Sequence, residues 1–203
     1  MLDSKTQKKT QGFSLIELML VIAVIMILAA ISVPRMMTVV NDISLRYVAT
    51  DLSGLLQSAR IQAVRQNTFY SLIPGTLPSG QSMYFISTPS GAAYVNGNPV
   101  LPYNSTITIH QGPGSGAPNE TAFLTSLKFV VDPAADAPSF SARGLPCIGA
   151  GNACAQIPGQ GFVMFVTRGA VIGNIPWAAI VVNPSGHIQI WTCSSAGNWI
   201  QRD

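Results

Sequence analysis

The sequence carries little charge. Asp, Glu, Lys and Arg make up only 9% of its 203 residues, whereas they make up about 25% of a typical soluble domain. The formal net charge of +3 gives no basis for the strongly basic surface that nucleic-acid-binding proteins use. Histidine occurs twice and cysteine three times, without the spacing of metal ligands, so we expect no metal ion and no cofactor.

Motifs for catalysis are missing as well. No serine lies in a G-x-S-x-G nucleophile elbow. The segment "GPGSG" lacks the Lys-Ser/Thr ending of a phosphate-binding loop, and we expect "QGPGSGAPNE" to be a flexible loop. The two histidines, His110 and His187, fall in expected strands. We therefore expect no catalytic residues and no enzymatic activity, although residues far apart in sequence can still assemble a catalytic triad in space.

The chain does contain one long apolar run near its start. From Phe13 to Val33, every residue except Ser14, Glu17 and Ser32 is apolar or alanine. Because a helix rises about 1.5 Å per residue, this run of roughly 21 residues would span about 31 Å, the thickness of a bilayer core. The sequence therefore predicts one membrane crossing.

The residues before the run predict its orientation. Three lysines and a single acidic residue precede it: Lys5, Lys8, Lys9 and Asp3. Such a lysine bias holds a segment in the cytoplasm, so we expect residues 1–12 to be cytoplasmic and the rest of the chain to lie outside the cytoplasm. A removed secretory signal also starts with basic residues, but its apolar core is shorter, and "LAAIS" matches its cleavage site poorly.

Glu17 is the unusual residue of the run. A charge inside a membrane anchor costs about 2.5–3.5 kcal/mol on insertion scales. A cut between Gly12 and Phe13 would create an α-amino group about one helical turn before Glu17. The amine and the carboxylate could then neutralise each other, within one chain or between neighbouring helices.

The segment "GFSLIEL" resembles the type III signal of type IV pilins and of type II secretion pseudopilins. The resemblance implies that an inner-membrane prepilin peptidase removes residues 1–12 after Gly12 and methylates the new N-terminus at Phe13. It also implies that Glu17 guides assembly with other pilin or pseudopilin subunits into a helical filament. Pro34 matches the helix break that follows the membrane helix in this family. A plain signal anchor with an incidental glutamate is the alternative interpretation.

Beyond Pro34 the pattern stays helical to about residue 67. Small or apolar residues recur at three- and four-residue spacing, which predicts one buried stripe, formed by Val40, Ile43, Tyr47, Val48, Leu52, Leu55, Ala59 and Ala63. Short runs of period two follow and predict strands: "SMYFIST", "AAYV", "TITIH", "SLKFVV", "GFVMFVT" and "WAAIVVNPSGHIQIWTC". In the last of these, "NPSG" predicts a hairpin turn between Ala178–Val182 and His187–Thr192.

Together these patterns predict an α+β, pilin-like fold. A long N-terminal hydrophobic helix, whose second half is amphipathic, packs on an antiparallel β-sheet domain and so buries both apolar faces. The expected organisation is a leader at 1–12, a transmembrane or filament-core helix at 13–33, its amphipathic continuation at 34–67 and an extracytoplasmic β-rich domain at 68–203.

The cysteines allow two interpretations. Cys147 and Cys154 bracket the short segment "IGAGNA", and outside the cytoplasm a disulfide between them would persist. Zinc is the alternative, but it would need Cys193 and a distant histidine. We expect the disulfide, and we expect Cys193 to be a small buried residue at the end of a strand.

Two further segments resemble particular pilin-like families. Both "SGLLQSARIQAVRQNT" and "VVNPSGHIQI" are similar to segments of H-type minor pseudopilins and of their FimT-like pilus relatives. The resemblance implies a minor structural subunit of a type II secretion pseudopilus, anchored once in the inner membrane, with its C-terminal domain in the periplasm or in an extracellular filament. The alternative is a FimT-like minor type IV pilin in pilus assembly, motility or DNA uptake.

The sequence differs from FimT-like proteins at one point. Those that bind DNA have an arginine-rich motif after the turn glycine, whereas here Gly186 is followed by His187, Ile188 and Gln189. We therefore expect no DNA binding. An enzyme or an independent binding module is the rival of a different class.

Overall fold

A computed structural model describes residues 14–87, 99–133, 137–150, 153–169, 176–194 and 196–202. The predicted strand "AAYV" and the predicted cleavage site at Gly12 and Phe13 lie outside these residues. The chain divides into two compact units, Met1–Val40 and Asn41–Asp203. Each unit is described by itself.

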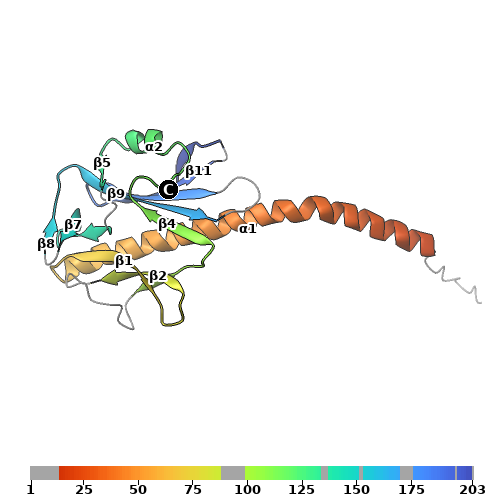
Figure 1. Ribbon diagram of the computed structural model, residues 1–203, viewed down its shortest axis with the longest axis horizontal. Helices are drawn as coiled ribbons and strands as arrows, with labels where there is room; N and C mark the ends of the chain where they lie inside the picture. The colour runs from red at the N-terminus through yellow and green to blue at the C-terminus, as the bar shows by residue number, and fades with distance from the viewer. Residues whose placement is uncertain are drawn as a thin grey trace, which may run out of the picture. The chain divides into compact units, whose positions relative to one another are not determined.

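The first unit contains the start of the long helix α1, which runs from Leu15 to Arg65 over 51 residues (Figure 1). Within it, Leu15–Val33 has a mean hydropathy of 2.9 and buries none of its residues. A helix that is apolar all round and uncovered by its own chain is stable only in apolar surroundings. Length and composition thus make this stretch capable of crossing a membrane, as the sequence predicts.

The helix does not break at Pro34. Its helical backbone continues through this residue without interruption, so the predicted helix break is wrong. Proline removes a single N–H donor from the helical ladder, and the bonds of the neighbouring turns are enough to keep one helix.

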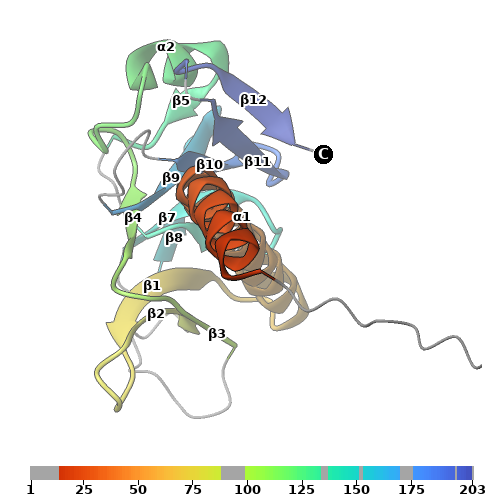
Figure 2. The ribbon, with the colours of Figure 1, turned by 90° about the vertical axis from the view of Figure 1, so that its right-hand side faces the viewer.

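The second unit contains the last part of α1, a short helix and two sheets (Figure 2). The first sheet has the order β3-β2-β1-β6-β7-β8. Its strands are β1 (Tyr70–Thr76), β2 (Ser82–Ser87), β3 (Val100–Pro102), β6 (Ser139–Phe140), β7 (Pro146–Ala150) and β8 (Ala153–Ala155). All of its pairings are antiparallel.

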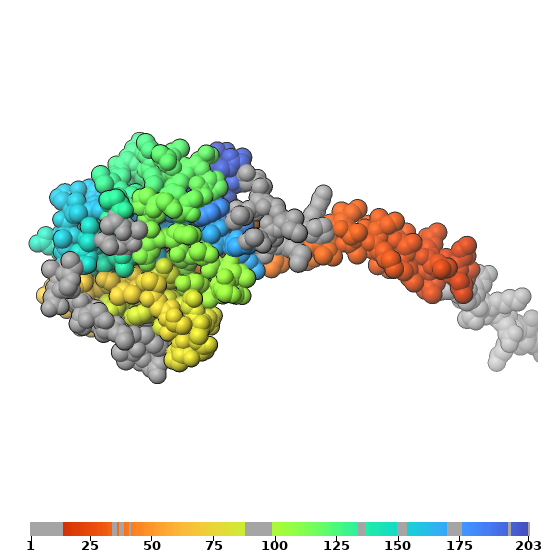
Figure 3. Space-filling view, viewed as in Figure 1, coloured from red at the N-terminus to blue at the C-terminus, as the bar shows by residue number. Residues whose placement is uncertain are grey.

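The second sheet has the order β12-β11-β10-β9-β4 and is also antiparallel along this path. Its strands are β4 (Ile107–Gln111), β9 (Gln160–Arg168), β10 (Trp177–Val182), β11 (Ile188–Cys193) and β12 (Trp199–Arg202). The short β5 (Val130–Val131) adds a parallel pairing to β9. In Figure 3 the β1–β2 hairpin and the segment holding β4 and α2 (Glu120–Ser126) form much of the visible surface of this unit.

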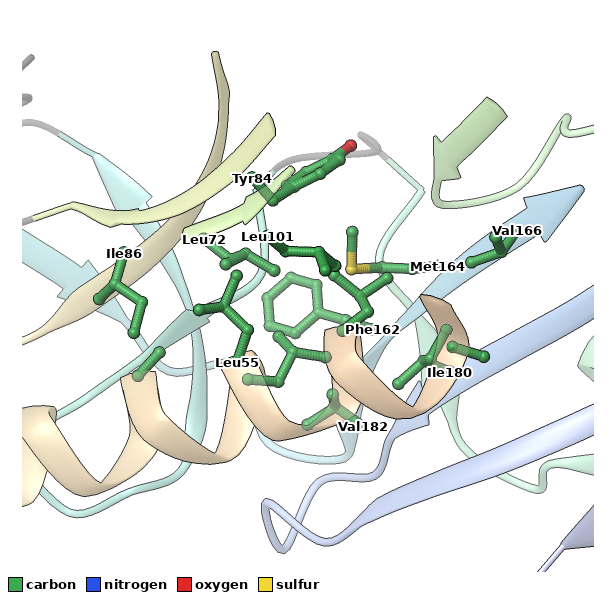
Figure 4. Close-up of a cluster of buried hydrophobic side chains, with 14 of the residues drawn as sticks. Leu55, Leu72, Tyr84, Ile86, Leu101, Phe162, Met164, Val166, Ile180 and Val182 are labelled. Atoms are coloured by element: carbon green, nitrogen blue, oxygen red, sulfur yellow. The ribbon is translucent and has the colours of Figure 1, made fainter. Parts of the chain in front are cut away.

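The central strands β9 and β10 are buried on both faces. Alternate residues of β9 enter two different cores, with Phe162, Met164 and Val166 in the first and Val163 and Phe165 in the second. The first core is filled by α1 and the first sheet, whose side chains point toward one another in Figure 4. The second core is filled by α2 and the tryptophans of the C-terminal strands. Because both faces are buried, the sequences of β9 and β10 are almost continuously apolar and do not alternate with polar residues.

The buried stripe of α1 is displaced from the predicted one. Leu52, Leu55, Ala59 and Ala63 are buried and Val48 packs against the core as predicted, but Val40, Ile43 and Tyr47 are 46–67% exposed. Their places are taken by Leu45, Ala49 and Leu56. The predicted stripe followed apolar character alone, whereas the buried stripe is the face of α1 that packs into the first core.

The predicted strand "SLKFVV" is largely wrong. Its first residue ends the helix α2, and only Val130–Val131 forms a strand. Between them Lys128 has a positive φ of 59°, which ends the helix in a turn. The hairpin at "NPSG" is confirmed, with Val182 paired to Ile188 and Trp177 to Cys193, but His187 lies in the turn and not in the strand.

The predicted disulfide is confirmed. Cys147 is bonded to Cys154, and their Cα atoms are 5.5 Å apart. The bond closes the small β7–β8 hairpin at the edge of the first sheet, where Gly149 pairs with Cys154. Cys193 is a free, half-buried thiol, and its burial raises its pKa.

Candidate functional site

Glu17 lies in the first turn of α1. The backbone N–H groups of Glu17 and Leu18 both donate to the carbonyl oxygen of Ser14 at 3.1 Å, which places Ser14 at the helix start. A carboxylate in the first turn also interacts favourably with the positive end of the helix dipole. The helix start therefore tolerates this charge better than the middle of the run would.

The Glu17 side chain nevertheless has no cation within its own helix turns. No Lys, Arg or His occurs between Lys9 and Arg35. The side chains next to Glu17 are exposed and apolar, with Ile16 at 74% and Leu18 at 56%. From Phe13 to Pro34 the sequence therefore offers this carboxylate no basic side chain as a partner.

A second candidate site lies entirely within the unit Asn41–Asp203. It is an open groove of about 390 Å³ beside the last turns of α1 and the turn of the β10–β11 hairpin. The lining residues are Gln57, Arg60, Ile61, Val64, Arg65, His187 and Ile188. We call it the arginine groove. Sequence reasoning did not find it, because its parts come from segments that are far apart in the chain.

The turn at the mouth of this groove is built by Asn183. Its side-chain Oδ1 accepts hydrogen bonds from the backbone N–H of Ser185 at 3.1 Å and of His187 at 2.9 Å. The backbone N–H of Gly186 donates to the carbonyl of Asn183 at 2.8 Å, and Gly186 has a φ of +78°. A tight turn that ends in a left-handed glycine fits the twist of a hairpin and fixes the position of His187.

The other polar groups that the sequence singled out lie in separate places in the described residues. No group of three or more His, Cys, Asp or Glu side chains among them could hold a metal ion. His110 lies in β4 and stacks on Trp177 with ring centroids 6.3 Å apart. Burial, together with the nearby Tyr103, raises the pKa of Tyr84 to about 12, so it stays protonated and structural.

The segment "QGPGSGAPNE" is a loop between its ends, as predicted, but Gln111 belongs to β4 and Glu120 to α2, and Glu120 binds the loop. The Glu120 carboxylate accepts hydrogen bonds from the backbone N–H of Gly114 at 2.6 Å and of Gly116 at 3.0 Å, and from the Ser115 hydroxyl at 3.0 Å. Burial opposes ionisation of Glu120, but these hydrogen bonds outweigh it and lower its pKa.

Comparison with known proteins agrees with the N-terminal site. Residues 7–33 match the protein-family model described as "Prokaryotic N-terminal methylation motif". The match covers the expected cleavage site, Glu17 and the apolar stretch that begins α1. No curated protein and no solved structure matches the chain.

The motif is the signal that prepilin peptidase recognises, and here it opens a helix long and apolar enough to anchor the chain in a membrane by one crossing. Such a signal is typical of structural subunits. The chain carries the N-terminal methylation motif of the type IV pilin-like proteins, the group that includes the pseudopilins.

Proposed function

We propose that this protein is a minor structural subunit of an inner-membrane filament, most simply an H-type pseudopilin of a type II secretion system. The observation that carries the proposal is the methylation motif at residues 7–33 leading directly into the apolar start of a 51-residue helix. That helix continues into an α+β unit with antiparallel sheets. The resemblance of "SGLLQSARIQAVRQNT", at the end of α1, and of "VVNPSGHIQI", in the β10–β11 hairpin, to segments of H-type pseudopilins supports the H-type assignment.

In this role, prepilin peptidase removes residues 1–12 and methylates Phe13. Glu17 then pairs with an N-terminal amine in the membrane and directs the subunit into the filament. The lysines of the leader keep it in the cytoplasm, so the unit Asn41–Asp203 lies in the periplasm or in the exported filament. The disulfide Cys147–Cys154 fits such an oxidising compartment.

The proposal is tested by the N-terminus of the mature protein. Mass spectrometry of the chain extracted from membranes of its native host should show a start at Phe13 with one added methyl group. Gly12→Leu should leave the chain beginning at Met1, because a bulky side chain before the cut prevents an extended backbone from entering the peptidase. Gln11→Leu, one residue earlier, is the matched control and should still be processed.

A wild-type chain that begins at Met1, or near Val33, would contradict the proposal. A pseudopilus and a type IV pilus have different gene neighbours, so the neighbouring genes separate the H-type assignment from the FimT-like alternative. A secretion operon supports the first, and a pilus operon supports the second.

A further inference from the structure

The arginine groove has no part in the role proposed above. Its volume of about 390 Å³ falls within the usual range of ligand pockets. Its chemistry is mixed, because guanidinium, amide and imidazole groups lie beside the apolar side chains of Ile61, Val64 and Ile188. The groove therefore offers polar recognition and apolar contact in one place.

Arg60 is held in position by two turns from different sheets. Its Nε–H donates to the carbonyl oxygen of Gly144 at 2.9 Å. Gly144 ends the turn between β6 and β7 with a φ of +72°, and Gly186 ends the turn between β10 and β11 with a φ of +78°. A Cβ atom at Gly186 would lie 3.2 Å from both Nε and Cζ of Arg60 and would collide with the Gly144 carbonyl oxygen. The absence of a side chain at both glycines lets the two turns close around the arginine.

This fixed position favours a role in binding. A free arginine side chain loses rotamer freedom when it is immobilised, and the bond to Gly144 has already restricted Arg60. Among the described residues, Gly144 is the only hydrogen-bond partner of Arg60, so its terminal Nη groups keep their donors. A planar guanidinium with free Nη donors is suited to bidentate contact with a carboxylate or phosphate.

The charge of the groove is not balanced from within. Two arginines line it, and no carboxylate among the described residues does. The dipole at the C-terminal end of α1 accounts for a cation at Arg65, which lies in the last turn. It does not account for Arg60, which lies earlier in the helix and is held by a different interaction.

We propose that the arginine groove binds an acidic peptide segment of a partner protein. The Arg60 guanidinium would bind one carboxylate, Arg65 a second, and the apolar wall would receive an aliphatic side chain between them. Acidic peptide fits better than nucleic acid, because non-specific binding to duplex DNA needs several phosphate contacts along a basic stripe. Here the cations are two, and apolar side chains separate them. This inference goes beyond the proposed filament role and does not depend on it.

The test uses the full chain in neutral detergent and three fluorescent probes. The first is a short peptide with two glutamates flanking a leucine in a Gly/Ser background, the second is the same peptide with glutamine in place of glutamate, and the third is a DNA duplex. Fluorescence anisotropy should show saturable binding of the acidic peptide, weakened by added salt, and weaker or no binding of the other two.

Variants locate the binding site. Arg65→Gln should weaken binding of the acidic peptide about tenfold, the loss of roughly one charge-assisted hydrogen bond. Arg60→Gln should weaken it at least as much. Arg65→Gln keeps the test valid if the Arg60 variant unfolds, because Arg65 is exposed and has no hydrogen bond or ion pair with another described residue. Arg46→Gln is the matched control, since Arg46 is exposed on the same helix outside the groove.

Several results would overturn the proposal. One is that the glutamine peptide binds as tightly as the acidic peptide, and another is that neither groove variant weakens binding. A third is that Arg46→Gln weakens binding as much as the groove variants do. The last is that the acidic peptide shows no saturable binding up to about 1 mM. Duplex DNA that binds more tightly than the acidic peptide, and loses affinity in Arg65→Gln, would assign the groove to nucleic acid instead.

Discussion

Gly186 and Gly80 are both left-handed glycines, but their surroundings differ. Gly186 has a φ of +78° and lies against Gly144 and Arg60, whereas Gly80 has a φ of +84° and has nothing within 4 Å of an added Cβ. The backbone cost of an alanine is therefore similar at the two positions, about 1–2 kcal/mol. Only at Gly186 does a steric cost add to it.

We predict that Gly186→Ala lowers the free energy of unfolding by at least about 3 kcal/mol, and Gly80→Ala by about 1 kcal/mol. At about 2–4 °C per kcal/mol for a chain of this size, the two variants should differ clearly in thermal unfolding followed by circular dichroism. Equal melting temperatures would show that the turns at Gly144 and Gly186 do not pack as closely as described here.

Glu120 gives the loop before α2 a dependence on pH. Burial raises its pKa, but hydrogen bonds that favour the ionised carboxylate lower the pKa below the ordinary value of 4.5. A group with a lowered folded-state pKa stabilises the fold fully above its unfolded pKa, and this contribution is lost as the pH falls through the folded-state value.

We therefore predict that Glu120→Gln destabilises the protein by about 1 kcal/mol at pH 7, and that the difference from wild type shrinks as the pH falls below about 4.5. Thermal unfolding of both proteins at pH 7 and at pH 3 measures this. Asp51→Asn, at an exposed helix position, is the control and should show no such pattern. A deficit that stays constant from pH 7 to pH 3 would mean that the Glu120 charge contributes nothing.

At the scale of elements, the β7–β8 hairpin depends on its disulfide. The two strands are short, and β8 is an edge strand of the first sheet. Two short strands alone are marginally stable in water. Closing a loop of about eight residues contributes roughly 2.5 kcal/mol in the chain-entropy description.

Replacing Cys147 and Cys154 together by serine should lower the free energy of unfolding by about 2–3 kcal/mol. Relative to wild type, the double variant should show faster amide hydrogen exchange in β7 and β8. Exchange in β9 and β10, whose residues fill the core, should change less. Cys193→Ser is the control, because Cys193 is not in a disulfide. Unchanged exchange in β7 and β8 would show that the hairpin is held by its strand pairing alone.

The elements that the sequence predicts are those whose signals are local. The β10–β11 hairpin follows from "NPSG" between β-branched runs, and the hydrogen bonds of its turn are made by residues of that segment and the next one, with Asn183 as the acceptor. The helix α2 could not be predicted in this way. Its N-cap residue, Asn119, has a left-handed backbone and makes no side-chain cap hydrogen bond. The position of the helix depends on the ring of Phe123, whose centroid lies 5.4 Å from that of Trp191 and 4.4 Å from that of Trp199. Those partners lie far along the chain.

The same distinction holds for the two sites of the whole molecule. The N-terminal signal can be recognised directly, because Gly12, Phe13 and Glu17 are neighbours in sequence and together make up a short motif. The arginine groove cannot, because it forms only where Gly144 and Gly186, on turns of two different sheets, meet Arg60 of α1. The separation of Arg60 and Gly144 is 84 residues, and no short motif carries that contact.

For the assembled molecule, Glu17 should matter to association and not to anchoring. Its carboxylate opposes membrane insertion by up to about 2.5–3.5 kcal/mol, and no basic side chain lies between Lys9 and Arg35 to offset this cost. In the proposed filament, the carboxylate is compensated by an N-terminal amine, so removing it removes both the insertion cost and the contact. Glu17→Ala should therefore insert as well as wild type or better, and yet assemble poorly.

Membrane fractionation and crosslinking in cells that express the whole filament system measure the two effects separately. We expect full recovery of Glu17→Ala in the membrane fraction and a loss of most crosslinks to neighbouring subunits. Ser32→Ala, a polar-to-alanine change at the other end of the same apolar run, is the matched control and should crosslink like wild type, because a hydroxyl carries no charge that needs a partner. Undiminished crosslinks in Glu17→Ala would show that the carboxylate has no part in assembly, even if the leader is cleaved after Gly12.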